Sequence, residues 1–195
     1  VDQMLALEPA IKKVGVVTES EVILGLPGET YETQINTLKK LLAAKLDYVQ
    51  VYTCMLINGS ELNTPEQRKK WNFKTKFRIL PRDFTTLKNG KKVIETEEVI
   101  VGSDTLSFNE YIELRLLSFS IFVTNIGIIY DSLLKFLRQN NIEIFDLFFQ
   151  MLKQIDSAPP KVQKIFDSVK NDMNDELWDS PDDIQAHYQE QAEYE

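Results

Sequence analysis

The stretch EVILGLPGET, residues 21–30, joins a short apolar, β-branched run to a turn and a helix start. A run of this kind is typical of a strand in a parallel sheet that is buried on both faces. Pro27 and Gly28 suit the central positions of a type II turn, because proline presets φ and glycine accepts a positive φ. Thr30 can then cap a helix over residues 31–44. The stretch therefore predicts a strand, a tight turn and a helix in direct succession.

The residues that follow continue this α/β pattern. Ile35, Leu38 and Leu41 recur at helical spacing, and residues 48–52 (YVQVY) form a second short apolar run. The order strand, turn, helix, strand indicates a βαβ unit. Ligands of α/β folds bind at the carboxyl ends of such strands, where a compact turn exposes main-chain N–H groups. The stretch lacks the lysine of a P-loop, and a purely structural turn is the alternative.

Downstream of residue 58 the pattern changes to a hairpin and helices. Asn89 and Gly90 predict a type I′ turn in a hairpin over residues 84–96, which residues 98–101 can extend. Ser107 and Glu110 form a capping box, from which a helix is expected to run to about residue 138. Further helices are expected at residues 2–14, at residues 142–155 and from residue 159 onward.

The charge is distributed unevenly. The net charge of −8 comes from 22 basic and 30 acidic residues, which argues against nucleic acid as a partner. Nine of the acids lie in residues 171–195, which contain no Lys or Arg, so the remaining chain has 22 basic and 21 acidic residues. We expect a near-neutral body and an acidic tail, in which Trp178 is either an anchor or disordered and His187 is exposed.

Residues 68–82 contain seven basic residues and no acid. Three interpretations are open for this basic segment. It can form an anion site with its aromatic side chains, it can be a solvated segment whose aromatic side chains dock on the core, or it can bind the acidic tail.

A single cysteine, Cys54, and a single histidine, His187, limit the chemistry of the chain. They exclude an intrachain disulfide, a cysteine-cluster metal site and a Ser-His-Asp triad in the body. The opening residues lack the apolar core of a signal peptide, so a cytoplasmic protein is expected. The apolar run at residues 114–130 contains Arg115 and is shorter than the roughly 20 residues of a membrane span, so no span is expected.

Residues 21–42 (EVILGLPGETYETQINTLKKLL) resemble the fifth strand, turn and helix of radical S-adenosylmethionine (radical SAM) enzymes, in particular the branch with a cobalamin-binding domain. Residues 48–63 resemble the sixth strand and loop of that family, with Asn58 and Ser60 where proline and threonine are usual. The resemblance covers about residues 1–65. It implies an α/β fold: the C-terminal portion of a partial (β/α)6 TIM-like barrel, followed by a β-hairpin and a mostly helical extension.

The resemblance also implies cofactors and contacts. The family binds a [4Fe–4S] cluster through C-x-x-x-C-x-x-C, and the cluster cleaves S-adenosylmethionine reductively to start a radical reaction; some members use cobalamin. One cysteine cannot hold a cluster, so no catalytic residue, metal ligand or bound cofactor is expected in this part. The resemblance places the side chain of Ile23 and the main chain of Gly25 against adenine, with main-chain polar contacts from Met55, Leu56 and Ile57.

Four segments follow from this interpretation: the last βα units of the barrel (1–65), a basic linker with the hairpin (66–106), a helical module (107–170) and the acidic tail (171–195). The chain would be an inactive C-terminal fragment of the enzyme, and its partner would be the missing N-terminal half. We expect Ile23 and Val49 to face nothing and one strand edge to be unpaired, so that the chain self-associates or packs its C-terminal helices over the sheet. A non-catalytic α+β interaction or regulatory domain is the alternative.

Two acids near the motif are ambiguous. Glu29 is interpreted as compensating the dipole at the helix start. Glu21 either points into the barrel or caps its rim.

Overall fold

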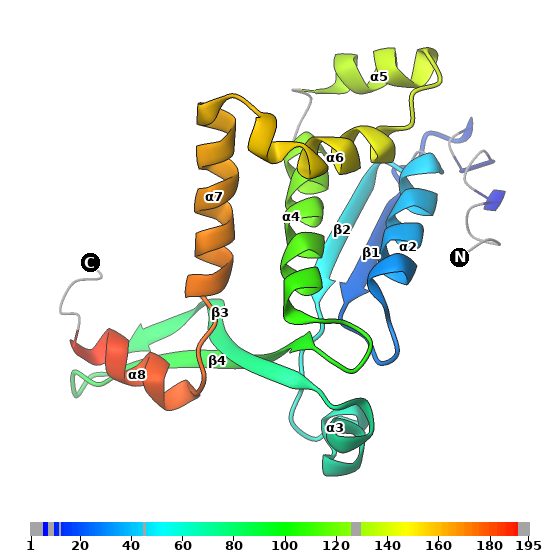
Figure 1. The fold of residues 1–195 in the computed structure, drawn as a ribbon. Coiled ribbons are helices and arrows are strands. Elements are labelled where there is room, and N and C mark those ends of the chain that lie inside the picture. Colours follow the sequence, from blue (N-terminus) through cyan, green and yellow to red (C-terminus); the bar gives the residue numbers. More distant parts are fainter. Residues whose placement is uncertain (1–5, 8–9, 12, 45, 126–129, 191–195) are drawn as a thin grey trace.

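The computed structural model describes residues 6–7, 10–11, 13–44, 46–125 and 130–190. Within these residues the fold is mixed α/β, with two separate two-stranded sheets. One sheet is parallel and is packed against helices, and the other is an antiparallel hairpin that lies across the end of the first (Figure 1). The α/β class is therefore confirmed, whereas the partial barrel stays a prediction.

The motif EVILGLPGET (residues 21–30) lies within the predicted βαβ unit, which the structure contains. Strand β1 (Glu19–Leu24) is followed by helix α2 (Tyr31–Ala43) and by strand β2 (Tyr48–Thr53), which runs parallel to β1. Thr30 caps α2, because its side chain accepts a hydrogen bond from the Thr33 N–H at 3.2 Å, while the Thr33 hydroxyl accepts one from the Thr30 N–H at 2.9 Å. This reciprocal pair satisfies two helix-start donors, so the local sequence alone determines where α2 begins.

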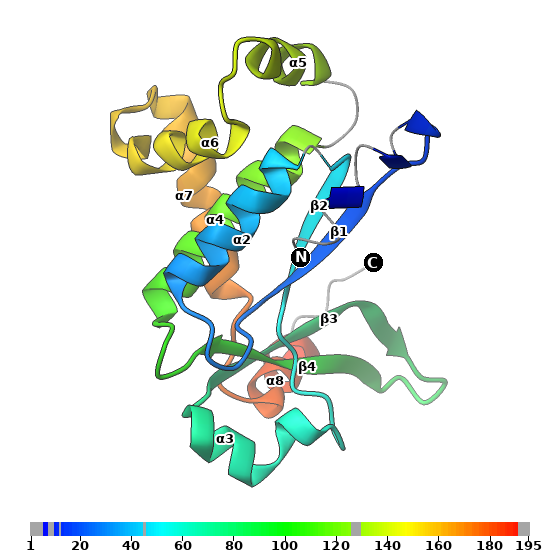
Figure 2. The same cartoon turned by 90° about the vertical axis from the view of Figure 1, so that its right-hand side faces the viewer.

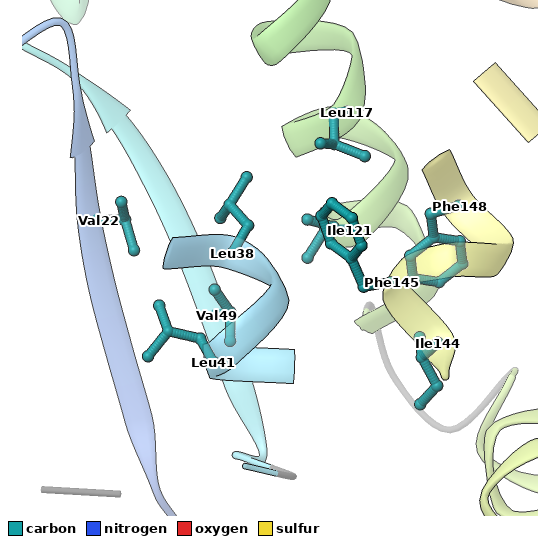
Figure 3. Packing of buried hydrophobic residues seen from close by; sticks show 9 residues of the cluster. All are labelled: Val22, Leu38, Leu41, Val49, Leu117, Ile121, Ile144, Phe145 and Phe148. Atoms are coloured by element: carbon teal, nitrogen blue, oxygen red, sulfur yellow. The ribbon is translucent and has the colours of Figure 1, made fainter. Parts of the chain in front are cut away.

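One face of the parallel pair is covered by helices. Figure 2 shows α2 and α4 (Phe108–Asn125) on the same side of β1 and β2, and Figure 3 shows how their side chains meet those of α6 (Ile144–Lys153). The main core consists of buried residues from the two strands and the three helices: Val22, Leu38, Leu41, Val49, Leu117, Ile121, Ile144, Phe145 and Phe148. The C-terminal helices thus pack over the sheet, as expected.

No helix or strand among the described residues covers the opposite face of the parallel pair. Ile23, Tyr48 and Tyr52 are 43%, 46% and 48% exposed, whereas Val49 is only 3% exposed. The expectation for Ile23 is confirmed. The expectation for Val49 is wrong, because alternate side chains of a strand point to opposite faces and Val49 lies on the face that the helices cover.

The hairpin is longer than predicted and its turn is different. Strand β3 (Lys74–Thr86) pairs with β4 (Lys92–Gly102). Leu87 donates its N–H to Lys91 O and accepts at its C=O from Gly90 N–H, each at 2.8 Å. Gly90 has φ +80° but Asn89 does not have a positive φ, so the type I′ prediction is wrong. The connection is a three-residue loop that ends in a glycine bulge.

The basic segment is divided between a helix and a strand. Its first part completes helix α3 (Pro65–Trp71), which follows a single turn, η1 (Glu61–Asn63), and its second part is the first half of β3. Asn72 joins them in the left-handed conformation, with φ +49°, which ends the helix and redirects the chain into the strand.

The predicted helix from Ser107 is interrupted. Its capping box is confirmed, because the Glu110 carboxylate accepts from the Ser107 N–H at 2.7 Å and the Ser107 hydroxyl accepts from the Glu110 N–H at 3.3 Å. However, α4 ends at Asn125, and α5 (Asp131–Gln139) is a separate helix. The prediction of one helix to residue 138 is therefore wrong. Residues 126–129, and most of the helix predicted at residues 2–14, lie outside the described residues.

The C-terminal region packs on the hairpin. After α6 come a short turn, η2 (Ile155–Ser157), helix α7 (Pro160–Asp175) and helix α8 (Pro181–Glu190), and α8 contacts β3 and β4. Ile184 of α8 is fully buried. The expectation of a tail separate from the body is wrong for residues 171–190, because apolar burial holds them in place. No helix in the described part of the chain is both long and apolar enough to cross a membrane.

Candidate ligand site at the ends of the parallel strands

The predicted type II turn closes the end of β1. Glu29 donates its N–H to Leu26 O at 3.1 Å, and Gly28 has φ +75°. Both features are those of a type II turn with Pro27 and Gly28 at its centre. The indole of Trp71 packs against Gly28, where an added Cβ would meet it at 3.3 Å. Helix α3 therefore covers the outside of the turn.

Gly25 is the residue at which β1 meets the hairpin. Its φ is +93°, and a Cβ at this position would lie 3.3 Å from the main-chain oxygen of Ile100 in β4. Its N–H donates to Glu29 Oε2 at 2.9 Å. The main-chain donor that the motif offers to a ligand is thus held by the chain's own carboxylate. Glu29 closes the turn with its side chain, a role that the helix-dipole interpretation did not include.

A half-buried carboxyl, Glu29, and a buried thiol, Cys54, lie beside this turn. Burial raises the pKa of the Glu29 carboxyl, although the hydrogen bonds from the Gly25 and Leu26 main chain lower it. Burial also raises the pKa of the Cys54 thiol, and the charge of Glu29 raises it further. Cys54 is 5% exposed. A neutral thiol of this kind is a weak nucleophile and a poor metal ligand, so Cys54 serves packing.

The segment after β2 is held between β1 and β4. Cys54 donates its N–H to Leu24 O at 2.8 Å and accepts from Ile100 N–H at 2.9 Å, and Leu56 donates to Glu98 O at 2.9 Å. These bonds flank Met55, which pairs with Val99 across an antiparallel bridge. In such a non-hydrogen-bonded pair, the main-chain groups of the central residue point away from the partner strand. The N–H and C=O of Met55 are therefore directed away from β4.

The five predicted contact residues do not form one surface. Ile23, Met55 and Ile57 are 43%, 42% and 62% exposed, whereas Leu56 is buried in the core. The Leu56 N–H is bonded to β4, and the Ile57 C=O accepts from the N–H and hydroxyl of Ser60 at 3.1 and 2.7 Å. Met55 is the member of the predicted 55–57 segment whose main-chain groups are directed outward.

A salt bridge that the sequence analysis did not find holds the loop after β2. The Arg68 guanidinium binds both carboxylate oxygens of Glu98, at 2.8 and 2.5 Å, and also donates to the side chain of Asn63. Arg68 lowers the pKa of the Glu98 carboxyl. The sequence shows that Arg68 is basic, but its partner Glu98 lies 30 residues further along the chain. No local sequence pattern therefore indicates this pair.

Metal-binding chemistry is limited at this site. Within the described residues no group of three His, Cys, Asp or Glu side chains is close enough to hold a metal ion. No model of a known protein family matches the chain, and no curated protein matches it.

Proposed function

We propose that this chain is the C-terminal part of a radical SAM enzyme, and that the ends of β1 and β2 bind the adenosyl group of S-adenosylmethionine. The observation that supports this most is the main chain of Met55, whose N–H and C=O point away from β4 beside the exposed side chain of Met55 itself. An adjacent donor and acceptor can pair with the edge of a purine, as a base pair would. The exposed side chain of Ile23, at the end of β1, supplies an apolar surface for the ring.

The open face of the parallel pair supports the same proposal. Parallel strands are normally covered on both faces, and Ile23 and Tyr52 lie side by side on the uncovered face, because they are partners in the register. Additional strands of a barrel would cover this face. The predicted N-terminal half of the enzyme, self-association and a cytoplasmic location all remain predictions.

The two implied cofactors fit the chain differently. The adenosyl group fits the strand ends, where it would meet apolar side chains and the main chain of Met55. The [4Fe–4S] cluster does not fit, because the chain has one cysteine and its thiol is buried with a raised pKa. The cluster and the reductive cleavage would belong to the other part of the enzyme. Cobalamin rests on the resemblance alone.

A non-catalytic α+β interaction domain is a second candidate, and one observation favours it. Glu29 occupies the N–H of Gly25, and β4 occupies the main chain of Cys54 and Leu56. Most polar groups at the strand ends are thus satisfied without a ligand. In this interpretation the turn has only a structural role.

A binding experiment separates the two candidates. We expect 5′-deoxyadenosine to shift the amide resonances of Met55 and its neighbours in a ¹⁵N-labelled sample, and we expect Ile23→Asp to abolish the shifts. Ile165→Asp is the matched control, because Ile165 is 55% exposed on α7, far from the strand ends in sequence. Equal binding by the parent and Ile23→Asp, or shifts confined to other segments, would contradict the proposal. A C-x-x-x-C-x-x-C motif in the coding sequence before Val1 is a second expected result.

A further inference from the structure

A groove runs along the outer edge of β2, on the side away from β1. It has a volume of about 310 Å³ and is lined by residues 50–53, by Phe119 and Phe122 of α4, and by Arg78 and Arg115. Successive residues of β2 point to opposite faces of the sheet, yet all four line the groove. The groove therefore follows the strand edge itself and does not belong to either face.

The main chain along this edge has unused hydrogen-bonding groups. Tyr48 and Cys54 donate their N–H groups toward β1, to Thr18 O at 3.0 Å and to Leu24 O at 2.8 Å. In a parallel pair alternate residues bond to the same neighbour, so the N–H and C=O groups of Val51 and Thr53 point to the outer edge. Among the described residues no strand pairs with this edge.

A side-chain group in the groove also has no partner. The hydroxyl oxygen of Thr53 is buried and forms no hydrogen bond within the described structure. A buried polar group without a partner destabilises the structure around it. Protein atoms cover this hydroxyl, so the groove offers a ligand the main chain of Thr53 and not its side-chain oxygen.

Two arginines line the groove, and the chain's own carboxylates pair with them. Arg78 Nε donates to Glu97, a residue of β4, so Arg78, Arg115, Glu97 and Glu176 together carry no net charge. The Arg78 and Arg115 side chains are only 20% and 16% exposed. Glu176, at the end of α7, accepts from Arg115 Nη1 at 2.6 Å and lies 3.5 Å from Arg78 Nη1. Each guanidinium has five N–H donors, so both can bind a carboxylate at this place. Glu176 shows where such a carboxylate would bind.

We propose that the outer edge of β2 binds an extended peptide segment of a partner protein, with an acidic side chain that reaches Arg78 and Arg115. Strand addition uses main-chain hydrogen bonds for affinity and side-chain pockets for specificity. Val51 and Thr53 supply the main-chain groups, Phe119 and Phe122 supply an apolar wall, and the arginines select the acid. This inference does not depend on the proposed function, because it concerns the edge of β2 and not the ends of the strands.

The experiment begins with a random heptapeptide library displayed on phage and selected on the whole chain. We expect the enriched peptides to carry an Asp or Glu among alternating apolar residues. Arg115→Gln should weaken their binding by about tenfold, and Glu176→Gln should strengthen it several-fold, because Glu176 then no longer competes for the arginines. Lys69→Gln, which removes an exposed charge of α3, is the control and should change nothing. Opposite effects of two variants in one ion cluster cannot result from loss of folding.

Hydrogen exchange locates the peptide. The amides of Gln50 and Tyr52 face β1 and should be protected already, whereas those of Val51 and Thr53 should become protected only when a selected peptide is bound. The proposal is overturned if no peptide is enriched, if neutral peptides are enriched equally, or if the new protection lies outside β2. It is also overturned if light scattering shows a dimer in which the amides of Val51 and Thr53 are already protected without peptide.

Discussion

The main chains of Phe77 and Trp178 exchange two hydrogen bonds, from Phe77 N–H to Trp178 O at 2.9 Å and from Trp178 N–H to Phe77 O at 2.8 Å. Trp178, in the segment between α7 and α8, thus acts as a short third strand on the outer edge of β3. The imidazole of His187 lies 4.9 Å from the Trp178 indole, centroid to centroid. Trp178 is therefore an anchor, and the interpretation in which the basic segment binds the acidic tail is the one that these contacts support.

The anchor should depend on apolar burial more than on charge. Ile184 is fully buried, and we expect Ile184→Ala to lower the free energy of unfolding by about 2–4 kcal/mol. Ile165→Ala, at a 55% exposed site, is the control and should cost far less. Urea unfolding followed by circular dichroism measures both.

The exposed ion pair between Lys76 and Asp179 should contribute little to the anchor. Lys76 Nζ lies 2.5 Å from Asp179 Oδ1, but the Asp179 side chain is 85% exposed, and exposed pairs contribute about 0–1 kcal/mol. We expect Asp179→Asn to change the unfolding midpoint little at low or high salt. A large loss that appears only at low salt would instead show that charge holds the tail.

Gly25 should tolerate no side chain. We expect Gly25→Ala to lower the free energy of unfolding by about 2–4 kcal/mol, because alanine is strained at φ +93° and its Cβ would press on Ile100 O. Gly59→Ala separates the two causes, since Gly59 has φ +82° but no atom within 4 Å of an added Cβ. It should show the conformational cost alone. Equal losses at both sites would mean that the contact with β4 contributes nothing.

Glu29 should make the fold less stable as the pH rises. Its pKa is raised from 4.5 by burial, so the folded state holds the proton more tightly than the unfolded state does. The stabilisation of the folded state that comes from the raised pKa of Glu29 is therefore complete below pH 4.5. It is lost as the pH rises through the pKa of Glu29 in the folded state. Glu29→Gln should remove this dependence and keep an acceptor for the Gly25 N–H. Glu29→Ala should cost about 1–3 kcal/mol, because that N–H then has no partner.

Urea unfolding at a series of pH values tests the Glu29 prediction. The parent and Glu29→Gln should converge at acid pH, and Glu29→Gln should be at least as stable at neutral pH. A parent that becomes more stable than Glu29→Gln as the pH rises would reverse the sign and refute the argument.

Glu98 should behave in the opposite way. Arg68 lowers its pKa from 4.5, so its stabilisation is present above pH 4.5 and is lost as the pH falls through the folded pKa. We expect Arg68→Gln to remove about 1 kcal/mol at neutral pH, a small value because the Arg68 side chain is 36% exposed. The loss should disappear in acid. Lys69→Gln, the neighbouring cation, should show no such pH-dependent difference.

The sequence predicted well the elements whose signals are local. The strand, type II turn, capped helix and second strand over residues 19–53 were all predicted, because Pro27, Gly28 and Thr30 act within a few residues of themselves. The division into separate helices α4 and α5 and the start of β3 at Lys74 were not predicted. A lysine-rich strand has no distinctive alternation, and β3 forms because β4 pairs with it.

The candidate site was only partly predictable for the same reason. The exposure of Ile23 was predicted from the expected absence of barrel strands opposite it. The burial of Leu56 did not, because it depends on β4, whose Glu98 and Ile100 approach from more than 40 residues further along the chain. The carboxylate of Glu29 accepts a hydrogen bond from the Gly25 N–H only because the turn between the two residues brings them together.

The pairing of Phe77 with Trp178 also has a consequence during synthesis. A ribosome adds roughly 5–20 residues per second, so the outer edge of β3 waits about 5–20 s for a partner that is encoded about 100 residues later. Throughout that time a basic strand edge is open to other nascent chains, and its density of lysine and arginine is what keeps it from joining them. The basic residues of β3, which resemble a ligand site in the folded protein, thus protect the nascent chain from association.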